Sequence, residues 1–246
     1  MKASAVEFRF RMIIMTLAVV LGFAAPWIEL LHLGTRTTTW LWLGFELGSL
    51  GVSANVAIKA VTFLTILVAG FAAAVRIWGT AYLGFGTVVN QEMKAGAVMA
   101  DGPYRFVRNP LYIGSWMMMA AISVLMPPTG ALVTMILLSI FLFRLILGEE
   151  AFLAKQLGDS YLAYRKAVPR LIPSLRPCVT ASGQRPNWSR AMLGELMPVG
   201  VLVSFAALSW QYDSELLIRA VLISFGLSLV VRALMIPLQS SPTAAG

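Results

Sequence analysis

The chain has 246 residues, of which 59% are hydrophobic and only 12% are Asp, Glu, Lys or Arg. This charged share is about half of the roughly 25% found in soluble domains, and a soluble surface could not be covered with so little charge. Together with a mean hydropathy of +0.80, the composition indicates an integral membrane protein. The formal charge of +8 would suggest nucleic-acid binding in a soluble chain. In a membrane chain such an excess more often sets topology, so no nucleic-acid partner is expected. One Cys and one His exclude an internal disulfide and a zinc site.

Six apolar runs are long enough, or nearly so, to cross a bilayer as helices, which takes about 20 residues each. They cover residues 12–28, 56–78, 111–127, 129–147, 193–210 and 216–234. The last four are only just long enough, so about six spans are expected and five are possible. Pro127 and Pro128 leave almost no loop between the third and fourth runs, which predicts an antiparallel hairpin. The expected fold is therefore an all-α, polytopic transmembrane helical bundle.

The positive charges predict the orientation of this bundle. With a cytoplasmic N-terminus, sixteen of the 19 Lys and Arg residues lie on the cytoplasmic side, and only Arg36, Lys59 and Arg219 lie outside. Both termini are then cytoplasmic. The basic start and first apolar run also resemble a signal peptide ending in small residues. That run is longer than a usual signal core, so a retained helix is expected.

The segment Asp101–Tyr112 runs directly into the third expected span. Gly102-Pro103 indicates a turn, and Asn109-Pro110 resembles an N-cap followed by proline at the first helical position. Free backbone N–H groups there, with Arg105 and Arg108 beside them, could bind a carboxylate or a phosphate. A capped helix whose arginines reach the interface is an equally good interpretation.

Two adjacent acids, Glu149 and Glu150, lie where the fourth expected span leaves the membrane, a place where burying a carboxylate is costly. Taken alone, the pair indicates a solvated helix end. Adjacent helical residues point about 100° apart, so one acid can face a cavity while the other reaches water. The hairpin would bring these acids and Arg144 to the same end as Arg108 and Tyr112.

One cytoplasmic cavity would then combine an anion receptor, a carboxylate and two tyrosines, Tyr104 and Tyr112. A zwitterionic amino-acid group fits this set, and tyrosine faces can contact a sulfonium by cation–π attraction. S-adenosylmethionine carries both features.

An ordered set of motifs resembles a known membrane family. It comprises Gly102–Tyr112, Glu149-Glu150, Leu157-Gly-x-x-Tyr161-x-x-Tyr164 and Val168-Pro-Arg. This order resembles the isoprenylcysteine carboxyl methyltransferases and the related phospholipid methyltransferases, over about residues 98–173. The resemblance implies a multispanning enzyme that binds S-adenosylmethionine at the cytoplasmic face and takes a lipophilic substrate from among the membrane lipids.

The resemblance also implies roles for individual residues. Arg144 lies near the family's substrate-binding arginine. Asn109 stands where the family commonly has histidine, and a further upstream histidine is absent from Lys94–Val98. The residues that fall on or beside the family's cofactor-binding elements are Tyr104, Arg108, Asn109, Pro110, Tyr112 and Glu149.

Three regions are expected: residues 1–97 with spans one and two, 98–173 as the methyltransferase core, and 174–246 with a cytoplasmic loop, two spans and a short tail.

A carboxylate acceptor needs no base, whereas an amine or phenol would need one, for which Glu150 or Tyr112 are candidates. No obligatory base is evident, which favours carboxylate or thiol methylation. The alternatives are a phospholipid N-methyltransferase, an NADPH-dependent reductase of the sterol type, and a non-enzymatic membrane scaffold or transporter. Spans with almost no charge at their centres argue against a transporter.

Overall fold

The computed structural model describes residues 2–84, 98 and 100–235. Regular structure within these residues is entirely helical, which confirms the predicted class. Residues 94–97, where the family's upstream histidine is absent, and the tail at 239–246 lie outside the described residues. The helices are α1 (Ala5–Arg9), α2 (Arg11–Ala24), α3 (Trp27–Leu31), α4 (Thr39–Ser49), α5 (Ala54–Leu83), α7 (Pro110–Ser123), α8 (Pro128–Ala167), α9 (Trp188–Gly194), α10 (Leu196–Leu208) and α11 (Ser214–Met235), with 3-10 turns η1 (Gly102–Arg105) and η2 (Ser209–Gln211).

Each of the six expected spans coincides with a helix, but their lengths differ. Helices α5, α8 and α11 are long and apolar enough to cross a membrane, and α9 with α10 forms a fourth candidate that bends by 70°. Helices α2 and α7 have 14 residues each, about 21 Å at 1.5 Å per residue, which is short of a hydrocarbon core of about 30 Å. By length, the described residues therefore support three to four spans, and the chain is an integral membrane protein.

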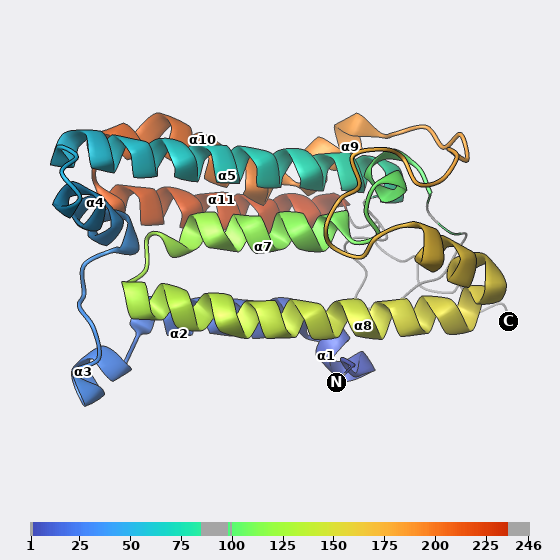
Figure 1. Ribbon diagram of the computed structural model, residues 1–246, viewed down its shortest axis with the longest axis horizontal. Coiled ribbons are helices and arrows are strands. Elements are labelled where there is room, and N and C mark those ends of the chain that lie inside the picture. Colours follow the sequence, from blue (N-terminus) through green and yellow to red (C-terminus); the bar gives the residue numbers. More distant parts are fainter. Residues whose placement is uncertain (1, 85–97, 99, 236–246) are drawn as a thin grey trace, which may run out of the picture.

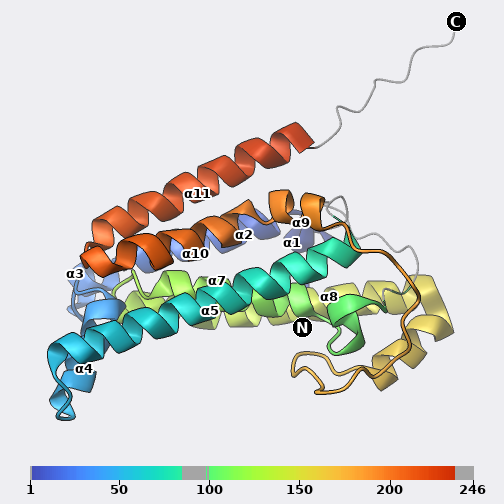
Figure 2. The ribbon, with the colours of Figure 1, turned by 90° about the horizontal axis from the view of Figure 1, so that it is seen from above.

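Helix α7 lies between α5 and α8 and packs against both (Figure 1). Helix α2 packs along α8 and α4 packs on α5, while α10 separates α5 from α11 (Figure 2). The core between these helices includes the fully buried side chains of Trp40, Met118 and Phe205. The predicted hairpin is confirmed, because α7 and α8 are joined by a four-residue connection and pack against each other.

Small residues let α2 approach α8 closely. A Cβ added at Gly130 would lie 2.1 Å from the backbone oxygen of Gly22, and one added at Gly22 would lie 1.9 Å from Oγ1 of Thr134. Close backbone contact of this kind stabilises membrane helix pairs. The α2–α8 pair therefore anchors the N-terminal part of the chain beside the hairpin.

Helix α8 changes direction at Gly158, whose φ of 56° and ψ of −134° are not helical. A positive φ is readily adopted by glycine because it has no Cβ. Beyond this residue the last turns of α8 fold back over the end of the bundle (Figure 1). They bring Tyr161 and Tyr164 into buried positions at the cavity described next.

Candidate active site

A cavity of about 580 Å³ opens at the end of the bundle where α5 ends, α7 begins and α8 passes Glu149. Its volume is within the range typical of small-molecule sites. Apolar side chains cover much of the wall, among them Met118, Leu145 and Leu153. The polar residues that line it are Arg11, Arg76, Tyr104, Arg108, Asn109, Tyr112, Ser115, Glu149, Glu150, Tyr161, Tyr164, Ser182, Gln184 and Arg232.

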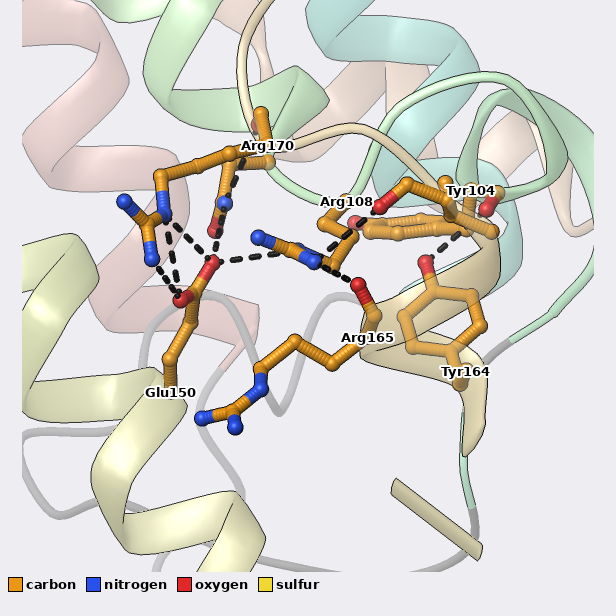
Figure 3. A network of polar contacts seen from close by, with 8 residues as sticks. Tyr104, Arg108, Glu150, Tyr164, Arg165 and Arg170 are labelled. Carbon is orange, nitrogen blue, oxygen red and sulfur yellow. Dashed lines mark hydrogen bonds and ion pairs between the residues drawn. The ribbon is translucent and has the colours of Figure 1, made fainter. Parts of the chain in front are cut away.

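Glu150 is held by two arginines (Figure 3). Nε of Arg108 lies 3.1 Å from Oε1 of Glu150, and Nη2 of Arg170 lies 2.9 Å from Oε2. Nδ2 of Asn109 also donates to Oε1, at 3.2 Å. With its carboxylate saturated and only 4% of the residue exposed, Glu150 joins the start of α7 to α8 and to the segment after α8. These donors compensate the charge of Glu150, so its carboxylate is not suited to accept a proton.

Asn109 stands at the predicted N-cap position of α7, but its side chain makes no capping hydrogen bond. The structure therefore confirms the N-cap position and the proline that follows it, but the side chain does not act as the cap. The amide instead donates to Glu150 and to the backbone oxygen of Arg170. A buried carboxylate is costly to leave without donors, and the Asn109 amide is one of the donors that satisfy it.

Glu149 points into the cavity and accepts a hydrogen bond of 2.8 Å from the hydroxyl of Tyr112. A carboxylate offers about four acceptor positions, of which Tyr112 uses one, and the positive charge of Arg11, which also lines the cavity, acts on the same carboxylate. The two adjacent acids thus differ in environment, but the expectation that one of them reaches water is wrong, because Glu150 is buried in its ion pairs. The structure brings Glu149, Tyr112, Asn109 and Arg108 to one site.

Tyr104 is buried in η1, and its hydroxyl has no hydrogen-bond partner among the described residues. Its backbone oxygen accepts from the hydroxyl of Tyr164 at 2.8 Å, which fixes the turn (Figure 3). Burial raises the pKa of the Tyr104 hydroxyl well above its ordinary value, and the nearby charge of Glu149 adds to this. Tyr104 therefore presents a protonated donor without a partner at the cavity wall, and leaving it unpaired costs free energy.

The arginines expected to form the anion receptor are already used by the protein. Nε of Arg105 donates to the backbone oxygen of Val179 at 3.0 Å. Nη1 of Arg108 donates to the backbone oxygens of Arg165 and Val168. Arg105 therefore binds the segment after α8, and Arg108 binds the end of α8 and the residue that follows it, so the structure offers neither of them as an open anion receptor.

Arg144 lies apart from the cavity. Its Nη2 is 2.7 Å from Oε1 of Glu7, and both side chains are about one-third exposed. Arg144 instead borders a separate apolar groove between α2 and α8. The structure therefore does not join Arg144 to Glu149 and Tyr112.

A second buried ion pair was not anticipated from the sequence. Glu195 is fully buried in the break between α9 and α10, and its carboxylate meets Nε of Arg76 at 2.6 Å and Nη2 at 3.0 Å. Thr80 donates to the same carboxylate at 2.6 Å, and Arg76 donates to Oγ of Ser115 at 2.6 Å. This group ties α5, α7 and α10 together beside the cavity. An acid within an expected span was the available signal, since an intramembrane charge needs a partner.

The loop that follows α8 is bound along the segment before α7. The carboxylate of Asp101 accepts the backbone N–H groups of Ser182, at 2.9 Å, and Gln184, at 3.1 Å, and the hydroxyl of Ser182. Burial raises the pKa of Asp101, but these hydrogen bonds outweigh it and place the pKa below its ordinary value. Because Ser182 and Gln184 line the cavity, Asp101 fixes one part of the cavity wall.

Comparisons with known proteins confirm the resemblance. Residues 56–160 match the model of the phospholipid methyltransferase family. Over 90 residues the chain is 36% identical to the protein-S-isoprenylcysteine O-methyltransferase of Schizosaccharomyces pombe (strain 972 / ATCC 24843). That alignment covers 35% of this chain and 37% of the yeast protein, so the chain matches well under half of its relative's length. No solved structure matches the chain significantly. The family match begins with α5, earlier than the motifs indicate, and includes Tyr104, Tyr112 and Glu149.

Proposed function

We propose that this chain is an S-adenosylmethionine-dependent membrane methyltransferase that transfers a methyl group to a lipophilic acceptor drawn from the bilayer. The observation that carries the proposal is the cavity at the end of the membrane helices in which Glu149, Tyr112 and Tyr104 meet, the Tyr104 hydroxyl having no partner within the described part of the chain. The family match and the yeast relative support the same activity.

The residues present fit this cofactor. The carboxylate of Glu149 suits an ammonium group, and the buried hydroxyl of Tyr104 suits an acceptor atom. The faces of Tyr104 and Tyr112 suit a sulfonium. When bound, S-adenosylmethionine supplies an electrophilic methyl group on its sulfur.

The protein's own contribution is positioning and exclusion of water. Glu150 and its two arginines fix the start of α7 against α8, and Asp101 holds the loop across the cavity. A carboxylate acceptor needs no base, and Glu150 is committed to its arginines. For an amine acceptor, Glu149 is the acid available to take a proton, through the hydroxyl of Tyr112.

The acceptor class can be tested directly. Purified protein in detergent should bind S-adenosylmethionine in isothermal titration, and NADPH should not displace it. With labelled cofactor and a membrane lipid extract, a carboxyl methyl ester should form, which alkali converts to labelled methanol. Absence of cofactor binding would refute the proposal, and displacement by NADPH would favour a sterol-type reductase.

A second candidate is N-methylation of a phospholipid, which the description of the matching family favours. The labelled product would then migrate with a phospholipid, and alkali would release no labelled methanol from it because the N–methyl bond is not hydrolysed. The same experiment therefore separates the two acceptors.

We also propose that the cavity faces the cytoplasm, with both termini on that side, because sixteen of the 19 cationic residues then lie inside. In a Cys178→Ser background, a cysteine at the exposed Lys166, near the cavity end, should react with an impermeant thiol reagent only in inside-out vesicles. A cysteine at the exposed Thr35 should react only in right-side-out vesicles. The reverse pattern would invert the topology.

A further inference from the structure

Arg232, in the last turn of α11, lines the cavity from outside the family-matched region. Its Nε is buried and has no hydrogen-bond partner among the described residues. Its Nη2 makes one long contact, 3.4 Å from the backbone oxygen of Gly194 at the end of α9. The side chain therefore reaches from the outermost helix into the site with donor capacity left over.

The neighbouring charges do not neutralise Arg232. Glu195 and Arg76 influence it electrostatically, as does Arg11. The carboxylate of Glu195, however, is occupied by Arg76 and Thr80. No ion pair to Arg232 is present in the part of the chain that the structure describes. Arg232 is half-buried, and a buried donor such as its Nε is costly to leave without a partner. A bound anion would remove that cost.

The surroundings favour a lipophilic anion over a water-soluble one. Met118, Met119, Met197 and Pro198 form apolar cavity wall, and Met197 and Pro198 lie three and four residues after Gly194 in the chain. Arg232 itself belongs to a helix long and apolar enough to cross the membrane. An arginine in such a setting binds carboxylate or phosphate oxygens well.

We propose that Arg232 is a substrate-binding residue that receives a carboxylate or phosphate oxygen of the lipophilic acceptor. The proposal deepens the proposed function, on which it rests, by assigning the acceptor an anionic group. It also gives α11, which the family match does not reach, a part in substrate selection.

The test measures lipid binding to the apoprotein in detergent by native mass spectrometry, without any methyl transfer. Two matched pairs serve as probes: oleate with methyl oleate, and dioleoyl phosphatidate with dioleoylglycerol. The wild-type protein should prefer the anionic member of at least one pair by about tenfold or more, as expected for a charge-assisted bond. The pair that shows the preference identifies a carboxylate or a phosphate.

Arg232→Gln should reduce this preference to about threefold or less, and Arg232→Lys should restore part of it. The matched control is Arg219→Gln, because Arg219 lies on the same helix but is exposed and pairs with Glu215. Equal binding of charged and neutral lipids by the wild type would overturn the proposal. So would an Arg232→Gln variant that keeps the preference, or one that loses affinity for S-adenosylmethionine alone.

A cross-linking experiment on the unmodified protein covers the case in which Arg232→Gln does not fold. Oleate with a diazirine near its carboxylate should label the Gly194–Pro198 segment or the end of α11. Labelling confined to the groove between α2 and α8 would contradict the proposal. Titration of S-adenosylmethionine in parallel tests the proposed function separately, so the two can fail independently.

Discussion

The cavity has two walls, and each combines a saturated acid with a charged group that is left for a ligand. On the α8 wall, Glu150 is saturated by Arg108 and Arg170, and the adjacent Glu149 faces the cavity. On the wall built by α5, α10 and α11, Arg76 lines the cavity and saturates the adjacent Glu195, and Arg232 keeps a donor that has no partner among the described residues. The first wall therefore suits a cation and the second suits an anion.

The comparison indicates that paired and partly paired charged groups at one site have different roles. A fully paired acid fixes the helices, while a partly paired charge next to it remains available for binding. Substitutions at the paired residues should therefore reduce stability, and substitutions at the others should reduce affinity.

The largest effect is expected at the buried pair of Arg76 and Glu195. Arg76→Leu leaves Glu195 charged and unpaired, so the free energy of unfolding should fall by about 3–5 kcal/mol. The double variant Arg76→Leu/Glu195→Leu should be less destabilised than the single one, because no lone charge remains. Denaturant unfolding in detergent measures the two single variants, Arg76→Leu and Glu195→Leu, and the double variant. A double variant that loses the sum of the two single effects would show that the pair is not coupled.

The next largest effect is expected from replacing the adjacent acids Glu149 and Glu150 one at a time. Glu149→Gln should weaken binding of S-adenosylmethionine by about 1.5–3 kcal/mol if the carboxylate holds the ammonium, with little change in thermal stability. Glu150→Gln is the matched control and should show mainly a loss of stability, since two arginines lose their counter-charge. Titration calorimetry and thermal unfolding of both variants check this. An unchanged affinity in Glu149→Gln would remove that assignment.

A smaller effect is expected at the loop that closes the cavity. Asp101→Asn removes the charge that accepts the loop N–H groups, so elastase should cleave after the exposed Ala181 about fivefold faster or more, with Asp159→Asn as an exposed control. The depressed pKa of Asp101 also sets a pH dependence. The stabilisation is present above the unfolded pKa of about 3.9 and is lost as pH falls through the lower folded value.

Pepsin digestion between about pH 4 and pH 2 tests this direction. Cleavage of the wild-type loop should increase toward that of Asp101→Asn as the pH falls. A constant ratio between the two proteins across the range would show that Asp101 does not control the loop by its charge.

The smallest effect is expected from Tyr104→Phe. Because the hydroxyl has no partner within the described residues, its removal should leave stability unchanged or raise it slightly, by up to about 1 kcal/mol. Affinity for S-adenosylmethionine should fall by about twofold to tenfold. Tyr164→Phe is the control, since its hydroxyl donates to Tyr104 and its loss should cost about 1 kcal/mol of stability. Equal stability losses in both variants would contradict the assignment of the Tyr104 hydroxyl as a donor for the cofactor.

Much of the α8 wall could be predicted because its signals are local. Pro127 and Pro128 indicate the hairpin, and helical geometry then places Glu149 opposite Tyr112. Span length was predicted less well, because an apolar run continues where the helix ends. The run through α2 continues past Ala24, but Ala25 is left-handed and Pro26 follows it.

The other wall could not be predicted because its contacts join distant parts of the chain. Arg76 and Glu195 are 119 residues apart, and each by itself resembles a charge at the end of a span. The same limit applies to Asn109 and Arg108. Their local pattern indicates a helix cap and an anion receptor, whereas the folded chain uses both to hold Glu150.

The length of α8 has a consequence for how an acceptor is found. Glu149 follows Pro128 by about 20 residues, or about 30 Å along the axis, which equals the thickness of the hydrocarbon core. A carboxylate at that height is level with the head groups of the leaflet at that end. A lipid diffusing within its own leaflet would carry its head group past the cavity opening without leaving the bilayer. The encounter would then be a two-dimensional search, governed by the surface density of the lipid rather than by its solubility in water.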